Sequence, residues 1–315
     1  MTLPLWDRVT VVGCGLIGAS FALALRECDA CRVIAGWDSS PSVLDEALAR
    51  RVIDEVDRSF AAREVSASDL VYLATPVGGI VAFMCECGSS LKPGATVTDA
   101  GSTKVEVCRA AREHLREGVL FVGGHPVAGS HRAGIANARA DLFRGAPYVL
   151  TAGADEGDRR FAMLKETISA VGARVEITSD SAHDRAMAFV SHLPQLLSSA
   201  LAATVNAQAD AESLIRLSGA GYRDMTRLAA SPWQMWRDIL ATNPAPVAEA
   251  LGATIERLAQ LREELEGAAG GGADDLPFAR ALFGQARRSR TPARADALAP
   301  ASSGEGYDSD SHREH

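Results

Sequence analysis

Imidazole titrates near neutral pH, so the seven histidines are the first candidates for acid-base chemistry. His312 and His315 lie in a polar C-terminal segment, and His114 lies on a predicted helix that ends in charged residues. His125 is different, because it stands in a Gly-Gly-His-Pro turn directly after an apolar run, 119–122, that predicts a β-strand. An imidazole in such a turn can point into a crevice. We therefore predict that His125 is a catalytic acid-base residue.

Two arginines could bind an anionic ligand. Arg223 and Arg227 are four residues apart on a predicted helix, 222–230, so they share one face and repel each other unless an anion lies near both. A guanidinium binds a carboxylate through two parallel hydrogen bonds, which makes Arg227 a candidate carboxylate ligand. The alternative, which applies most to Arg223, is that both are solvated beside Asp224 and Asp238.

A second histidine lies next to a proline in the middle of a long predicted helix. Pro194 removes one helical hydrogen bond and clashes with the carbonyl group four residues before it, so a kink is expected, and a kink of this kind suggests a site. His192 and Gln195 share one face of this helix. His183 lies on another side of this helix. We interpret His183 and Asp184 as structural residues or as residues that support the site without contacting a ligand.

The elements that must position these residues begin with a glycine-rich segment near the N-terminus. An apolar run, 9–12, leads into Gly13-Cys14-Gly15-Leu16-Ile17-Gly18, and a helical stretch and a second apolar run follow, ending at Asp38. This order of strand, turn, helix, strand and acid is typical of a dinucleotide site. The amides of the turn and of the helix start, from Gly13 through Leu16 and Ile17 to Gly18, are expected to face the pyrophosphate.

The identity of the dinucleotide follows from Asp38. At the end of the second strand its carboxylate can accept hydrogen bonds from both hydroxyls of the ribose of NAD, and it would repel the 2′-phosphate of NADP. The residues that follow are Ser39, Ser40 and Pro41, with no arginine to receive a phosphate. We therefore predict NAD as the cofactor. The alternative is a domain of the same fold that binds no nucleotide.

Further apolar runs predict more strands of the same sheet. Each of these runs is followed by a candidate site residue. Thr75 and Pro76 follow the run 70–74, Ser102 follows the run 95–98, and His125 follows the run 119–122. Ligands of an open parallel sheet lie outside the carboxyl ends of its strands, so these residues should converge with the glycine turn on one crevice. Two later runs, 147–151 and 173–178, are expected to complete the sheet. The predicted fold class is α/β, a Rossmann-type doubly wound sheet followed by an all-α domain.

After residue 178 no strand pattern returns. Helices are predicted from Ser179 or Ser181 to about residue 206 and at 209–217, 222–230, 234–241 and 247–266. From residue 285 onward the composition cannot support a core. We therefore predict three parts, which are a dinucleotide-binding domain at 1–178, a helical domain at 179–284 and a disordered tail at 285–315.

Length, composition and charge limit the class of protein. The chain has 315 residues, 47% of them apolar, and a mean hydropathy near zero, which suits a protein with more than one buried core. A net charge of −8 argues against a nucleic-acid partner, which requires a basic surface. The apolar runs are interrupted by polar residues or glycine and no signal-peptide pattern opens the chain, so we expect a cytoplasmic protein without a membrane partner.

The cysteine spacing raises the question of a zinc site. Cys28 and Cys31 form a C-x-x-C pair, and Cys85 and Cys87 form a C-x-C pair. The first pair falls in the turn before the second strand, and the second falls on a predicted helix, 78–91, where residues two apart point to different sides. We predict ordinary thiols and no metal.

Five segments, which follow one another along the chain in the same order as in the family, match one enzyme family. They are Asp99 to Lys104, His125-Pro126-Val127-Ala128-Gly129-Ser130, Ala140 to Thr151, His183 to Pro194, and Gly221 to Arg227. Over about residues 8–265 the chain resembles the prephenate/arogenate (cyclohexadienyl) dehydrogenases of tyrosine biosynthesis.

The resemblance implies an NAD-dependent oxidative decarboxylation. In this reaction hydride leaves the ring carbon that bears the 4-hydroxyl group, CO2 leaves the opposite ring carbon, and the ring becomes aromatic. By position His125 matches the family's catalytic histidine, and Ser102 matches the serine that supports that histidine and the substrate near the nicotinamide. Arg227 matches the arginine that binds a substrate carboxylate, and His192 and Trp236 match pocket residues. The resemblance also implies a small cyclohexadienyl dicarboxylate substrate and a homodimer formed by the helical domain.

Two positions depart from the family pattern. Members often have histidine where this chain has Gln195, and an acid where it has His131. Both are expected near the pocket mouth, where the ketone of prephenate differs from the ammonium group of arogenate. We therefore include Gln195 and Arg223 among the predicted substrate-binding residues, and the choice of substrate stays open. The ring-amine analogue 4-amino-4-deoxyprephenate is a further alternative.

Two other functions fit the architecture. A β-hydroxyacid dehydrogenase or imine reductase also joins a nucleotide domain to a helical one, but the former uses a lysine in the first long helix of the second domain, and residues 180–206 contain none. A sensor or scaffold could bind NAD without turnover, but that role gives no reason for His125, His192 and Arg227 to occur together.

Overall fold

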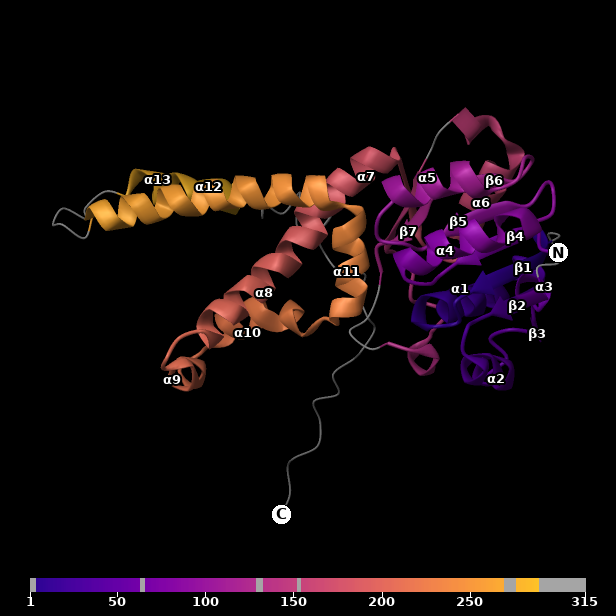
Figure 1. Ribbon diagram of the computed structural model, residues 1–315, viewed down its shortest axis with the longest axis horizontal. Helices are drawn as coiled ribbons and strands as arrows, with labels where there is room; N and C mark the ends of the chain where they lie inside the picture. Colours follow the sequence, from indigo (N-terminus) through magenta and orange to yellow (C-terminus); the bar gives the residue numbers. More distant parts are fainter. Residues whose placement is uncertain (1–3, 63–65, 129–132, 152–153, 269–275, 289–315) are drawn as a thin grey trace, which may run out of the picture. The chain divides into compact units, whose positions relative to one another are not determined.

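The computed structural model describes residues 4–62, 66–128, 133–151, 154–268 and 276–288 (Figure 1). They fall into two compact units, 1–253 and 254–315, which are described separately. The first unit contains a six-stranded parallel sheet in the order β3-β2-β1-β4-β5-β6. The strands are β1 (Trp6–Val12), β2 (Cys31–Trp37), β3 (Glu55–Val56), β4 (Leu70–Leu73), β5 (Thr96–Asp99) and β6 (Leu120–Val122). This order is that of a Rossmann-type sheet, so the predicted fold class is confirmed.

Helices cover both faces of this sheet and give it two cores. The helices are α1 (Leu16–Glu27), α2 (Pro41–Ala49), α3 (Ser59–Ala62), α4 (Val77–Cys87), α5 (Val105–His114) and α6 (Arg159–Ala170). Val9 and Val11 of β1 pack in one core with Phe21 of α1, whereas Val12 packs in the other with Ile80 of α4. Because both faces are buried, the strands are continuous apolar runs, and this is the pattern that made them predictable.

Three further strands form a second sheet and do not complete the first. They are β7 (Gly124–Pro126), β8 (Pro147–Thr151) and β9 (Arg174–Thr178), in that order, with β7 antiparallel to β8 and β8 parallel to β9. The prediction that 147–151 and 173–178 extend the parallel sheet is therefore wrong. The placement of His125 in a turn is also wrong, because it lies on β7, opposite Val149. The carboxylate of Asp99, the last residue of β5, accepts the N–H of Gly124 at 3.0 Å, and this bond ties the start of β7 to the end of β5.

The helical part of the first unit follows β9. Its elements are α7 (Asp180–Met187), a π-helical turn η4 (Ala188–His192), α8 (Leu193–Asn206), α9 (Ala211–Arg216), α10 (Ala220–Thr226), a 3₁₀ turn η5 (Arg227–Ala230), α11 (Trp233–Thr242) and α12 (Pro244–Ala268), which continues into the second unit. The interruption predicted at Pro194 is present as the π turn, which ends two residues before the proline. The predicted helix 222–230 is two pieces, so Arg223 and Arg227 do not share one continuous helix.

The second unit contains α12 from Thr254 onward and α13 (Pro277–Arg288), a helix that the sequence did not predict. The carboxylate of Glu264 accepts the backbone N–H groups of Phe278 and Ala279, at 2.8 and 2.9 Å, and thereby caps the start of α13. This cap comes from another helix, so no local sequence pattern predicts the start of α13. Residues 285–288 of the predicted disordered tail are consequently helical, and 289–315 lie outside the described residues.

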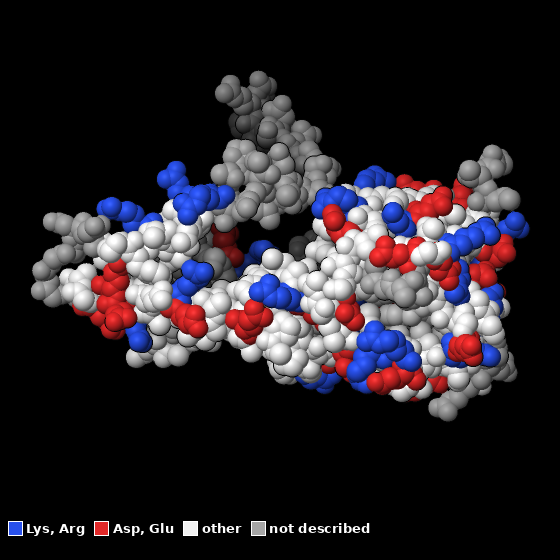
Figure 2. Space-filling model, turned by 90° about the horizontal axis from the view of Figure 1, so that it is seen from above, with Lys and Arg blue, Asp and Glu red and all other residues white. Residues whose placement is uncertain are grey.

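One described stretch, Asp180–Asn206, is long and apolar enough by composition to cross a membrane. The same stretch contains buried His183, Asp184 and His192, whose polar atoms are hydrogen-bonded within the fold. These bonds identify it as part of the folded domain. On the face shown in Figure 2, acidic and basic side chains are interspersed and form no continuous basic stripe.

Candidate active site

The glycine turn between β1 and α1 has the geometry of a phosphate-binding loop. Gly13 has a φ of +92°, and a Cβ at Gly18 would lie 2.0 Å from the carbonyl oxygen of Gly13. A Cβ at Gly15 would meet nothing within 4 Å, so the space beside this residue is open. α1 begins at Leu16 without a side-chain cap, which leaves the first amides of the helix, including that of Ile17, without a side-chain partner. These features fit the pyrophosphate of a dinucleotide.

Asp38 follows β2 and is held against the glycine turn. Its Oδ2 accepts the N–H of Cys14 and its Oδ1 accepts the N–H of Ser40, each at 2.9 Å. A mostly apolar cavity of about 510 Å³ lies at the carboxyl ends of β1, β2 and β4. Residues that line it include Trp37, Ser39, Thr75, Pro76 and Phe83. The chain neighbours of Asp38 thus line a cavity whose size and lining fit the adenosine of a dinucleotide.

His125 is held by a chain of polar contacts that starts on another element. Its Nδ1 lies 2.8 Å from Nε2 of His183 on α7, and the two rings are tilted by 74°. Nδ1 of His183 lies 2.8 Å from Oδ1 of Asp184. The Asp184 carboxylate also accepts the backbone N–H groups of Lys104 and Val105 at the start of α5, at 2.7 and 2.9 Å. His183 therefore touches the predicted catalytic histidine directly.

A fully buried ion pair fixes the strand that carries His125. Lys104 pairs with Asp99, and neither side chain has exposed surface. Nζ of Lys104 also donates to the carbonyl oxygen of Gly124 at 2.7 Å, while Asp99 accepts the N–H of the same glycine. Both backbone groups of Gly124 are thus held one residue before His125. This pair was not predicted from the sequence, although a lysine in the segment after β5 was an available signal.

His192, in the π turn, is buried between two other elements. Its Nδ1 lies 3.3 Å from Nδ2 of Asn243, the single residue between α11 and α12, and that Nδ2 donates to the carbonyl oxygen of Asp184 at 2.8 Å. The ring of Trp236 meets His192 edge-on, with centroids 5.8 Å apart. Nε1 of Trp236 is buried and has no hydrogen-bond partner among the described residues. A buried donor without a partner is costly, so this N–H is a candidate ligand contact.

Desolvation favours the neutral form of both histidines, of which His192 is buried and His125 half-buried. Desolvation lowers the pKa of His125 well below its ordinary value of 6.5, and the nearby His183, Lys104 and His192 lower it further. Desolvation also lowers the pKa of His192 to about 4, although the Asp184 carboxylate opposes this effect. A neutral imidazole has one nitrogen that accepts a hydrogen bond and one that donates. Each histidine can therefore offer either function to a ligand.

Gln195 joins α8 to η5. It is buried, its Nε2 donates to the carbonyl oxygen of Leu228 at 2.8 Å, and its Oε1 accepts from the hydroxyl of Ser231 at 3.2 Å. This amide is thus bonded to the protein itself. Arg227, next to Leu228, is exposed, and its guanidinium forms no hydrogen bond or ion pair with a described residue, whereas Arg223 makes one long contact, 3.5 Å, to a backbone carbonyl group.

The structure brings some of the predicted site residues together and leaves others apart. His125, His192 and Trp236 form one group through contacts that include His183 and Asn243. Ser102 is half-buried on the loop after β5, and its hydroxyl forms no hydrogen bond with a described residue. Arg227 lies at the start of η5, which Gln195 of α8 binds through the carbonyl oxygen of Leu228. His131, where the family pattern departs, lies outside the described residues.

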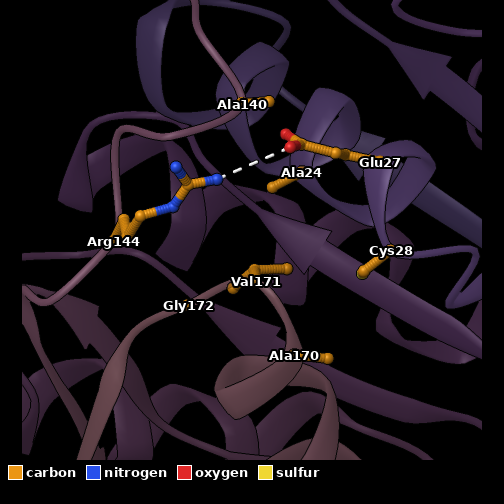
Figure 3. Close-up of a pocket in the computed structure, with 8 residues that line it drawn as sticks. All are labelled: Ala24, Glu27, Cys28, Ala140, Arg144, Ala170, Val171 and Gly172. Atoms are coloured by element: carbon orange, nitrogen blue, oxygen red, sulfur yellow. Dashed lines mark hydrogen bonds and ion pairs between the residues drawn. The ribbon is translucent and has the colours of Figure 1, made fainter.

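A second cavity, of about 190 Å³, lies at the other end of α1 from the glycine turn (Figure 3). Glu27 and Arg144 face each other across it as an ion pair with a distance of 3.5 Å, so its charged groups satisfy each other. Cys28 also lines it and is a free thiol, as is Cys31, whose pKa is raised to about 12 by burial. Within the described ranges no group of three or more histidine, cysteine or acidic side chains could hold a metal ion.

Comparison with known proteins agrees with this geometry. The family description "Prephenate dehydrogenase, nucleotide-binding domain" matches residues 21–177, and "Prephenate dehydrogenase, dimerization domain" matches 179–276. The chain is 33% identical to the prephenate dehydrogenase of Bacillus subtilis over 82% of its own length and 70% of the relative's.

Solved structures give the same result. Prephenate dehydrogenase from A. aeolicus, in complex with hydroxyphenyl propionate and NAD+, has a TM-score of 0.81 and 31% identity, with coverage of 90% of this chain and 96% of that one. Arogenate dehydrogenase from Synechocystis has a TM-score of 0.77 and 27% identity, with coverage of 93% and 100%. These matches span both the parallel sheet and the helical part. The chain belongs to the prephenate dehydrogenase family.

Proposed function

We propose that this chain catalyses the oxidative decarboxylation of prephenate to 4-hydroxyphenylpyruvate. It is an NAD-dependent dehydrogenase, and NAD, when bound, accepts the hydride from ring carbon 4 of the substrate. The observation that carries the proposal is the position of His125. This imidazole lies on β7, directly after the parallel sheet whose glycine turn and cavity fit a dinucleotide, and its lowered pKa favours the neutral form.

His125 acts on the proton of the substrate 4-hydroxyl group. It accepts that proton on a ring nitrogen as the C–H bond at carbon 4 breaks. Loss of CO2 from the opposite ring carbon then leaves the electron pair that makes the ring aromatic. The proton returns from His125 to the phenolate oxygen, so the residue ends in its starting state. Ser102, whose hydroxyl is free of other described partners, supports the substrate and His125 near the nicotinamide.

The remaining pocket residues favour a keto acid. Arg227 offers one carboxylate a guanidinium that pairs with no described residue, and Trp236 offers a buried N–H that has no partner within the described part of the chain. The ammonium group of arogenate would need an acceptor, but the Asp184 carboxylate is occupied by three N–H donors and Gln195 by backbone and serine contacts. We therefore propose prephenate as the preferred substrate.

We also propose that the chain forms a homodimer through its helical part. Large apolar side chains are exposed there, including Val190 (69% exposed), Leu217 (83%) and Trp233 (63%). Apolar surface of this kind is typical of a contact with another chain. The family description that matches residues 179–276 names a dimerization domain. Sedimentation or light scattering should give twice the mass of one chain.

The test is NADH formation by the purified chain with each substrate and each coenzyme. We expect turnover with prephenate and NAD, and a lower kcat/KM with arogenate or with NADP. His125→Asn should lower kcat by roughly 10²- to 10⁴-fold with little change in KM. Arg227→Ala should mainly raise the KM for prephenate. Small and equal effects of the two substitutions, or no turnover of any cyclohexadienyl substrate, would contradict the proposal.

A further inference from the structure

Two short hydrogen-bond chains start at Asp184, and each ends on one of the two pocket histidines. The side-chain carboxylate of Asp184 leads through His183 to His125. The backbone carbonyl group of Asp184 leads through Asn243 to His192. When a chain begins at a group that can only accept, every proton along it is fixed, because each neighbour must donate where the next one accepts.

In the first chain the fixed acceptor is the Asp184 carboxylate. Its oxygens already accept the backbone N–H groups of Lys104 and Val105, which shows that the group acts as an acceptor here. Nδ1 of His183 must therefore donate, and in the tautomer whose single ring proton lies on Nδ1 the Nε2 of His183 is bare. Nδ1 of His125, 2.8 Å from that nitrogen, must then carry the proton. The consequence is that Nε2 of His125 is bare and can accept a proton.

In the second chain the fixed acceptor is a backbone carbonyl oxygen. It faces Nδ2 of Asn243 at 2.8 Å, and a carbonyl oxygen can only accept, so the orientation of the Asn243 amide is set. The same Nδ2 lies 3.3 Å from Nδ1 of His192. Because an amide nitrogen can only donate, Nδ1 of His192 is bare. The proton of the neutral His192 ring is therefore on Nε2, which can donate to a ligand.

We propose that Asp184, His183 and Asn243 are positioning residues that hold His125 and His192 in opposite tautomers. His125 presents a bare Nε2 to the substrate, and His192 presents an Nε2–H. The roles of these nitrogens rest on the proposed function: the first accepts the hydroxyl proton, and the second donates to an oxygen of the substrate. The sequence separates the three residues widely from His125. The fold brings them together through α7, which lies beside α5 (Figure 1), and through the bond from Asn243, between α11 and α12, to Asp184.

The surroundings of the two rings are consistent with this arrangement. The groups that face His125 are His183 from α7, Lys104 from the start of α5, and His192 from the π turn. Those that face His192 are Asp184 and His183. Desolvation lowers the pKa of both rings below the ordinary histidine value, which favours the neutral ring with a single proton whose position the hydrogen bonds select.

The first experiment reads the tautomers directly and needs no turnover. 15N-histidine labelling of the complete chain, with signals assigned through His125→Asn and His192→Gln, distinguishes bare from protonated ring nitrogens. We expect a bare Nε2 on His125 and a bare Nδ1 on His192. Should His125 instead be bare at Nδ1, or His192 at Nε2, the proposal is overturned. This result is independent of the substrate, so it separates failure of the tautomer assignment from failure of the proposed function.

The second experiment compares two substitutions of His183. In His183→Gln the amide can still donate to Asp184 and accept from Nδ1 of His125, whereas in His183→Leu it can do neither. We expect kcat within about 10-fold of the unmodified chain for His183→Gln and a loss on the order of 10²- to 10³-fold for His183→Leu, with the KM for NAD unchanged. Equal kcat values for the two variants, at equal thermal stability, would overturn the role of His183.

The third experiment replaces an acceptor by a donor in the first hydrogen-bond chain and a donor by an acceptor in the second. Asp184→Asn can place an N–H opposite His183, which moves the proton of His125 to Nε2, so kcat should fall on the order of 10²-fold or more. Asn243→Asp can accept from Nδ1 of His192, which removes the donor at Nε2, so the KM for prephenate should rise about 10-fold with a smaller change in kcat. If Asp184→Asn unfolds the chain, the comparison of His183→Gln with His183→Leu tests the first hydrogen-bond chain instead. Retention of both parameters by folded variants would contradict the proposal.

Discussion

Lowering the pH from 7.5 to 5.0 should weaken the fold through His192 alone by about 2 kcal/mol. The pKa of this buried ring is lowered to about 4, against 6.5 for an unfolded histidine. At pH 5.0 the unfolded chain would hold this proton almost fully and the folded chain about one-tenth of the time, a difference of about 2 kcal/mol by linkage. Because the folded pKa is lowered, this contribution is complete above the unfolded pKa and is lost as the pH falls through about 6.5 toward 4.

His125 adds to the same trend. Its pKa is also lowered on burial, so the folded chain again binds fewer protons than the unfolded chain. The loss of stability measured for the unmodified chain should therefore exceed that from His192. For this reason the test is a difference between variants.

The assay is urea unfolding at pH 7.5 and pH 5.0, followed by circular dichroism. His192→Gln removes the titrating ring, so its loss of unfolding free energy between the two pH values should be smaller by about 2 kcal/mol than that of the unmodified chain. His114→Gln is the matched control, because His114 is exposed at the end of α5 and its removal leaves the buried rings in place. The same pH-dependent loss in His192→Gln and in the unmodified chain would refute the reasoning.

Other predictions concern the dinucleotide site and the buried ion pair. Gly18→Ala should lower both the Tm and the affinity for NAD, because the new methyl group would lie 2.0 Å from a backbone oxygen. Gly15→Ala should leave the Tm unchanged, because no atom lies within 4 Å of its Cβ position, and should lower the affinity, because the methyl group would fill space expected for the pyrophosphate. Calorimetry of both variants checks this. Asp38→Asn should lower the preference for NAD over NADP in kcat/KM, because the charge that repels a 2′-phosphate is lost. Lys104→Met should cost about 3–5 kcal/mol in urea unfolding, because Asp99 would stay buried without its counter-ion.

Much of the fold could be predicted from local pattern. Strands β1, β4 and β5 are buried on both faces, so they are continuous apolar runs, and the glycine turn after β1 identifies the sheet as a nucleotide-binding one. The separate sheet of β7, β8 and β9 could not be predicted in this way. It depends on the carboxylate and ammonium groups of Asp99 and Lys104 holding Gly124, which are contacts between residues distant in sequence.

The same division applies to the site. His125, His192 and Trp236 were predicted from position and resemblance, and the structure groups them, although their roles remain predictions. Asn243 was missed, because a single asparagine between two helices has no distinctive spacing. Its importance arises only where α11 ends beside the carbonyl oxygen of Asp184. Hydrogen bonds of this kind are set by tertiary structure, and periodicity does not reveal them.

The short stretch between the π turn (Ala188–His192) and Gln195 is intolerant of changes in length. Each residue of an α-helix rotates the chain by roughly 100°, so one residue inserted or deleted between His192 and Gln195 would turn Gln195 and the rest of α8 relative to His192. Gln195 would then face away from Leu228, and η5, which carries Arg227, would lose its attachment to α8. Insertions and deletions acquired during evolution should therefore accumulate in the surface loops of this enzyme and spare the segment from α7 to α8.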